Sequence, residues 1–167
     1  MVTKNEWVQK VEELQRLSVQ LEKTVSVLTA DDLDRLPKDG GWTIRHIVHH
    51  LADSVSIWDQ FVRQSLTGQV GEFPLRWYLD TPQDEWAEIW NYASRDIRPS
   101  LDLYQACLEH MVSLLSPIED PEGLALEISW KPGEKELVPL LEVVSFQPEH
   151  LAGHLKDINH ILQASAD

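Results

Sequence analysis

The sequence predicts an all-α protein, a helical bundle with short connecting helices. Four long segments carry apolar residues at helical spacing, and no convincing series of alternating strands accompanies them. The chain has 167 residues, of which 43% are hydrophobic, and this suits one packed globular unit. We therefore expect a single domain over residues 1–167.

The first long helix follows a capping box formed by Thr3 and Glu6, and its apolar spacing continues to Leu28. Residues 29–36 are typical of a short capped turn of helix. Proline and glycine then break the pattern over residues 37–41, so a loop is expected before the second long helix.

The second long helix is expected from Thr43, which is placed to cap it, to about Leu66. Residues 67–80 contain glycine, proline and several aromatic residues. A long loop of this kind is more often a packed surface lid than a disordered linker. Another helical stretch starts at Thr81 and is interrupted at Pro99.

The third long helix is expected over residues 100–115, and a Ser-Pro pair ends it. Residues 118–136 are broken by proline and glycine, although residues 124–130 could form a short extended piece. The last helix is expected from Leu137 to about Leu162. These long segments lead to an all-α bundle, an architecture that often builds metal sites from inward side chains on facing helices.

Composition excludes several classes of partner. The net charge of −14, from 28 acidic and 14 basic residues, would repel phosphate backbones and anionic lipids, so nucleic acid and membrane are not expected partners. The N-terminus lacks the basic and apolar regions of a signal peptide, and the single cysteine, Cys107, suits a reducing compartment. We expect a cytoplasmic protein in which Cys107 is a buried apolar filler.

The last helix carries His150 and His154, which are four residues apart and so share one helix face, about 40° from each other around the axis. Both fall near the apolar side of this helix, whereas His160 falls on the far side and is expected in water. Pro148 predicts either a kink or a new segment at that point. Both histidines follow the proline and keep their spacing, but a catalytic metal usually takes three protein ligands.

The second helix offers three candidates for a third ligand. His50 lies on a second apolar stripe, whereas His46 and His49 group with Asp53 on the polar side, so we favour His50. A pairing of His46 with His50 is the alternative, and it would give the site four ligands. His110 of the third helix lies opposite the apolar face and is expected to be exposed.

Histidines that point into the bundle can also be structural, because a single histidine on an apolar face is more often a hydrogen-bonded core residue than a metal ligand. The competing function is therefore a non-catalytic helical bundle that acts as a dimeric interaction or metal-binding protein. Metal analysis separates these two classes of function.

Two motifs resemble the DinB/YfiT-like superfamily, in particular its metal-dependent hydrolase and thiol S-transferase branch. They are Gly40-Gly41-Trp42-Thr43-Ile44-Arg45-His46-Ile47-Val48-His49-His50-Leu51-Ala52-Asp53-Ser54 and His150-Leu151-Ala152-Gly153-His154-Leu155. The resemblance implies an antiparallel four-helix bundle, often a homodimer, with a divalent metal bound by one histidine of the second helix and both of the last. By position the second-helix ligand is His50, which agrees with the helix phase.

Members of this superfamily include transferases that attach low-molecular-weight thiols such as bacillithiol or mycothiol to electrophiles. A divalent metal on three neutral imidazoles would favour loss of a proton from water or a thiol near neutral pH. Zinc, nickel, iron and manganese all suit imidazole ligands. Asp53 and Asp157 each lie three residues beyond an expected ligand, where a carboxylate could orient an imidazole or take a proton. The expected partners are a small-molecule electrophile or thiol.

Overall fold

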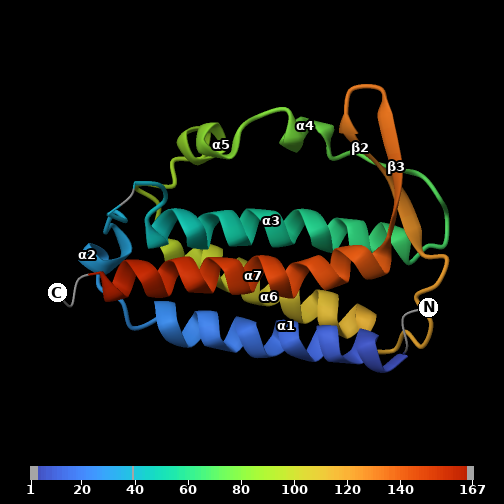
Figure 1. The fold of residues 1–167 in the computed structure, drawn as a ribbon, viewed down its shortest axis with the longest axis horizontal. Helices are drawn as coiled ribbons and strands as arrows, with labels where there is room; N and C mark the ends of the chain where they lie inside the picture. Colours follow the sequence, from blue (N-terminus) through green and yellow to red (C-terminus); the bar gives the residue numbers. More distant parts are fainter. Residues whose placement is uncertain (1–3, 39, 165–167) are drawn as a thin grey trace.

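Four long helices form the body of the protein in a computed structural model that describes residues 4–38 and 40–164. They are α1 (Lys4–Val25), α3 (Ile44–Ser65), α6 (Ile97–Leu115) and α7 (Leu140–Gln163). Helices α1 and α7 run in one direction and α3 and α6 in the other, and α7 packs against both α1 and α3 (Figure 1). The expected four-helix bundle is confirmed.

Apolar residues spaced three and four apart bury one stripe of every long helix. On α1 the stripe includes Trp7, Leu14 and Leu21, which are almost completely inaccessible to solvent. The predicted capping box of α1 involves Thr3, which lies outside the described residues. No helix among the described residues is both long enough and apolar enough to cross a membrane.

A small sheet at one end of the bundle was not predicted. It contains β1 (Glu72–Phe73), β2 (Ala125–Lys131) and β3 (Glu134–Pro139), with β1 parallel and β3 antiparallel to β2. The extended piece expected over residues 124–130 is present as β2. The prediction that the last helix starts at Leu137 is wrong, because Leu137 pairs with Glu127 in the sheet and the helix begins at Leu140.

Short helices occupy the connections. Helix α2 (Ala30–Leu33) has a complete capping box, in which Thr29 Oγ1 accepts from the Asp32 amide. The loop expected over residues 67–80 contains β1 and α4 (Arg76–Leu79), and α5 (Gln83–Ile89) follows. Figure 1 shows α4 and α5 along the outer side of α3, away from α1.

Two prolines lie inside long helices. Pro99 belongs to the first turn of α6, where a backbone N–H has no helical partner to lose, so α6 begins at Ile97 and not at Ser100 as expected. The helical stretch expected from Thr81 is not interrupted by Pro99, because α5 already ends at Ile89. Pro148 lies within α7, which continues from Leu140 to Gln163. No new segment begins at Pro148, and the residues after it keep helical phase.

Candidate metal centre

Three imidazole rings meet between α3 and α7. The Nε2 atom of His150 lies 3.2 Å from Nε2 of His50 and 3.1 Å from Nε2 of His154. One potential ligand atom from each ring lies within 4.8 Å of the others, so these three histidines could hold a metal ion. The structure thus brings together His50, His150 and His154, the set that the sequence singled out.

The positions of the three histidines around the axes of α3 and α7 bring their rings together. His150 and His154 are one turn apart on α7, and His50 faces them from the neighbouring antiparallel helix α3. Aromatic residues support the rings on two sides. Trp42 contacts His50 edge-on at a centroid distance of 5.0 Å, and Phe146 stacks on His150 at 5.2 Å. These contacts limit the movement of the His50 and His150 rings.

The surroundings keep these imidazoles neutral. Burial, reinforced by the neighbouring His150 and His154 rings, lowers the pKa of His50 to about 3. Burial and the His154 ring lower the pKa of His150 to about 4. Burial also lowers the pKa of His154, although Asp157 opposes this shift. Neutral imidazoles have the lone pair that a metal ligand needs.

The donor set fits a divalent cation. Nitrogen ligands about 2.0–2.1 Å from a tetrahedral metal are about 3.3 Å from one another, close to the Nε2 separations between His150 and its two neighbours. Three nitrogen lone pairs cannot approach so closely without a proton or a cation between them. The Nδ1 atoms of His50 and His154 are buried and make no hydrogen bond of good geometry, although the Asp157 carboxylate lies 3.5 Å from that of His154. Metal binding through Nε2 would make both of them N–H donors.

The two aspartates proposed to assist the ligands have different surroundings. Asp157 Oδ2 lies 3.5 Å from His154 Nδ1, which is the position expected for a carboxylate that orients this ring. Asp53 Oδ2 instead accepts a hydrogen bond from Tyr92 Oη at 2.5 Å, and burial raises the pKa of Asp53. The structure records no hydrogen bond between Asp53 and His50.

His49 is the main correction to the histidine assignments. We expected it on the polar side of its helix, but it is 0% exposed and its Nδ1 lies 2.7 Å from Ser100 Oγ. Burial and the nearby charge of Arg95 lower its pKa to about 4. The pattern of α3 alone did not indicate that His49 is buried, because its burial comes from α6, which packs against α3 and gives it a second buried face.

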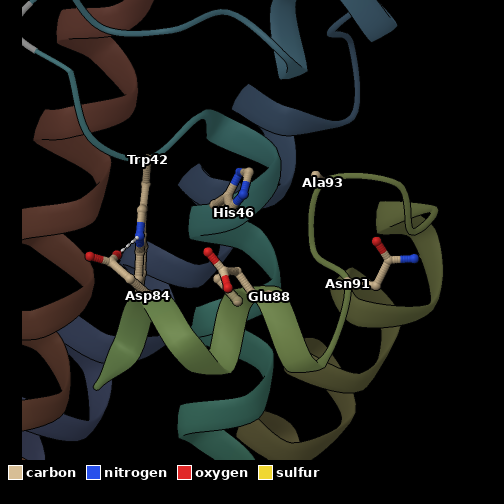
Figure 2. A pocket seen from close by; sticks show the side chains of 7 residues that line it. Trp42, His46, Asp84, Glu88, Asn91 and Ala93 are labelled. Atoms are coloured by element: carbon tan, nitrogen blue, oxygen red, sulfur yellow. Dashed lines mark hydrogen bonds between the residues drawn. The ribbon is translucent and has the colours of Figure 1, made fainter. Parts of the chain in front are cut away.

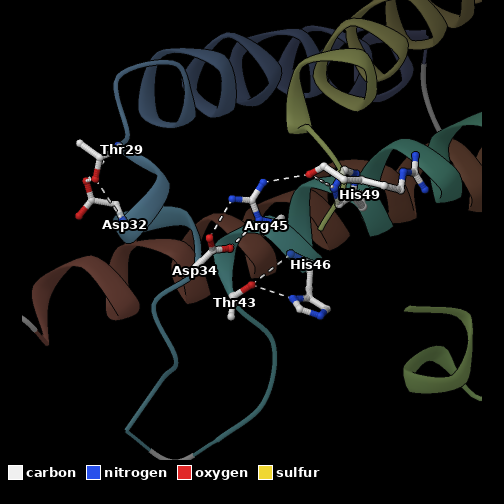
Figure 3. A network of polar contacts seen from close by, with 8 residues as sticks. Thr29, Asp32, Asp34, Thr43, Arg45, His46 and His49 are labelled. Atoms are coloured by element: carbon white, nitrogen blue, oxygen red, sulfur yellow. Dashed lines mark hydrogen bonds and ion pairs between the residues drawn. The ribbon is translucent and has the colours of Figure 1, made fainter. Parts of the chain in front are cut away.

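His46 is not part of the cluster, so the alternative pairing with His50 is not realised. Its Nδ1 lies 2.7 Å from Oγ1 of Thr43, the N-cap of α3 (Figure 3). Arg45, beside it in the sequence, binds Asp34 through two nitrogens and donates to the Arg95 carbonyl. This network fixes the start of α3, and hence the register of His50, relative to its neighbours.

The remaining two histidines are exposed, as their helix phases predict. His160 on α7 is exposed and borders the same cavity as His154. His110 on α6 is also exposed, but its Nδ1 lies 2.8 Å from Asp59 Oδ1, and Asp59 also pairs with Arg63. Asp59 is buried, so its contact with His110 links α3 to α6 and has a structural role.

Trp42 borders two cavities, and sequence reasoning identified neither. One has a volume of about 420 Å³ and is lined by His46, Glu88 and other residues, as Figure 2 shows. The other has a volume of about 450 Å³ and is lined by His154 and Asp157 among others. Trp42 and Asp84 border both cavities, and Trp42 Nε1 donates to Asp84 Oδ1 at 2.7 Å. The second cavity therefore gives solvent and small molecules access to His154, one of the three clustered histidines.

Named proteins from two bacteria are similar in sequence to most of this chain. A protein of Oceanobacillus iheyensis named "Putative metal-dependent hydrolase" is 31% identical over 157 residues, which cover 94% of this chain and 84% of that protein. YfiT of Bacillus subtilis carries the same designation and is 29% identical over 163 residues, which cover 95% of this chain and 83% of YfiT.

Solved structures show the same fold. That of YfiT, described as a probable metal-dependent hydrolase with an unusual four-helix bundle topology, matches with a TM-score of 0.79 at 26% identity and covers 99% of this chain and 89% of YfiT. A mycothiol-dependent maleylpyruvate isomerase matches in fold, with a TM-score of 0.68 at 15% identity over 95% of this chain and 63% of the isomerase. The family model of the DinB superfamily matches residues 13–158, and this chain therefore belongs to the DinB superfamily.

Proposed function

We propose that this protein is a metal-dependent enzyme in which His50, His150 and His154 hold a divalent ion that activates a water or thiol nucleophile. The observation that carries the proposal is the convergence of three neutral imidazoles from α3 and α7, with Nε2 separations of 3.2 and 3.1 Å. The relatives named as metal-dependent hydrolases support this assignment.

The ion would act as a Lewis acid that lowers the pKa of a coordinated water or thiol, so that a nucleophile forms near neutral pH. The protein's own residues would orient the ligands and admit the substrate. Asp157 is placed to hold the His154 ring, and Trp42 limits the movement of His50. The cavity beside His154 has room for a small electrophile such as an ester, an amide or an activated alkene.

Elemental analysis of protein purified without a histidine tag is the first test. Wild-type protein should contain about one divalent ion per chain, whether zinc, nickel, iron or manganese. The variants His50→Ala, His150→Ala and His154→Ala should each lose the ion. His160→Ala is the control for metal content, because His160 is an exposed histidine on the same helix as two of the ligands and is not one of the three clustered histidines, so this variant should keep the ion. A folded wild-type protein that binds no divalent ion would refute the proposal.

A second assay separates the two nucleophiles. Metal-loaded protein is offered a model ester, and in parallel a model electrophile together with bacillithiol or mycothiol. Release of acid without consumption of thiol indicates a hydrolase. Loss of free thiol that depends on the enzyme indicates a transferase.

A further inference from the structure

Gln147 on α7 has a buried hydrogen-bond donor that nothing in the protein satisfies. The residue is 5% exposed, and its Nε2 atom has no hydrogen-bond partner. Among the described residues, the other fully buried side-chain nitrogens that make no hydrogen bond of good geometry are Nδ1 of His50 and Nδ1 of His154, and only the second has a carboxylate, that of Asp157, at 3.5 Å. The unsatisfied polar atoms are thus confined to the histidine cluster and to a residue three positions before His150.

Helix geometry places Gln147 beside the cluster. It precedes His150 by three residues and His154 by seven, so the three side chains lie within about 60° of one another around the axis of α7. Helices α3 and α7 are antiparallel neighbours in Figure 1, with His50 opposite His150 and Trp58 in contact with Phe146. Gln147 therefore lies at the edge of the cluster nearer to the sheet, on the face of α7 that is packed inside the bundle.

Packing alone does not explain an amide at this position. Neighbouring buried positions of the same helix, Val143, Val144 and Leu151, are apolar, and a leucine would fill a comparable volume without a polar atom. A buried N–H without an acceptor is destabilising, and unsatisfied groups of this kind are uncommon in folded proteins. The position therefore carries a cost in stability, which a bound acceptor would remove.

We infer that Gln147 donates its free N–H to the carbonyl oxygen of the substrate that binds at the histidine cluster. This inference rests on the proposed function, and it narrows the substrate class to compounds with a carbonyl oxygen, such as esters, amides and related electrophiles. The amide is uncharged and does not titrate, so it can bind a neutral carbonyl over a wide pH range. The same donor would stabilise negative charge that develops on this oxygen when a nucleophile adds to the carbonyl carbon.

The test uses Gln147→Leu, which removes the donor and keeps the approximate size of the side chain. Gln163→Leu is the matched control, because it makes the same chemical change at an exposed position of α7. Four properties are measured for wild-type and both variants: metal content, thermal unfolding midpoint, binding of trifluoroacetamide followed by fluorine NMR, and hydrolysis of p-nitrophenyl acetate.

The inference predicts a specific combination of results. Gln147→Leu should keep the wild-type metal content and unfold about 2–4 °C higher, because the unsatisfied donor is gone. Its affinity for trifluoroacetamide should fall about tenfold, as expected for the loss of one hydrogen bond. Its kcat for p-nitrophenyl acetate should fall about 100-fold or more. Gln163→Leu should match the wild-type protein in all four measurements.

Two results would overturn the inference while leaving the proposed function intact. One is unchanged affinity for trifluoroacetamide in Gln147→Leu with a full complement of metal, which would make the amide a structural residue. The other is a lower unfolding midpoint together with loss of metal, which would mean that Gln147 supports the cluster itself. A wild-type protein without metal refutes the proposed function instead, and the NMR titration still tests Gln147 in that case.

Discussion

Acidification should destabilise the metal-free protein through His49, and glutamine at this position should remove that contribution. His49 is fully buried, and burial lowers its pKa from 6.5 to about 4. The unfolded chain therefore binds this proton more tightly than the folded protein does. The stabilisation is complete above pH 6.5 and is lost as the pH falls towards 4.

The magnitude follows from the two pKa values. Between pH 7 and pH 5, a histidine with a pKa of 6.5 in the unfolded chain and about 4 in the folded protein lowers the free energy of unfolding by about 2 kcal/mol. His49→Gln keeps a polar side chain near Ser100 Oγ but cannot titrate. The variant is expected to be less stable than wild type at pH 7 and to lose about 2 kcal/mol less on acidification.

Urea denaturation of metal-free protein at both pH values gives the four free energies that are needed. Carboxylates and the other histidines titrate in both proteins, so their contributions cancel in the difference between wild type and His49→Gln. If the two proteins lose the same free energy to within about 0.5 kcal/mol, burial of His49 does not perturb its pKa and the reasoning is refuted.

Three other substitutions test the remaining parts of the structure. Asp157→Asn should weaken metal binding about tenfold in a competition assay with a chelator, because the carboxylate next to His154 Nδ1 becomes a neutral amide. Tyr92→Phe should lower the free energy of unfolding in urea by about 1–3 kcal/mol at pH 7, because the half-buried carboxylate of Asp53 loses its hydrogen-bond donor. Leu21→Ala should lower it by about 2–5 kcal/mol, because the side chain is fully buried between helices; a loss below about 1 kcal/mol would mean that the core closes around the missing atoms.

The long helices and the histidine cluster could be predicted because both depend on local periodicity. Spacing of four residues sets His150 and His154 on one face of α7, and apolar phase selects His50 over its neighbours on α3. The resemblance of the two motifs to a known family identified the same three residues. Helix phase is a property of one segment and needs no knowledge of the partner.

Features that depend on contacts between distant segments were not predicted. Residues 137–139 are apolar enough to extend the last helix, and only pairing with residues 125–127 makes them a strand. His49 lies on a face that is polar by sequence but is covered by α6, where Ser100 meets it. The bond between Trp42 and Asp84 joins residues 42 positions apart, and no local pattern indicates it. Each of these misses involves a contact partner that is far away in the sequence.

The direct junction between β3 and α7 determines where the chain can tolerate insertions. Strand β3 ends at Pro139 and α7 begins at the next residue, so no linker separates the sheet from the helix that carries His150 and His154. One additional residue between Leu140 and His150 would turn both imidazoles by about 100° relative to the sheet and away from His50. One additional residue at Gly133, in the turn of the hairpin, lengthens a loop and leaves the strand pairs in place. Homologous chains that differ in length at the hairpin turn can therefore keep the same site, whereas a length change within the first half of α7 would abolish it.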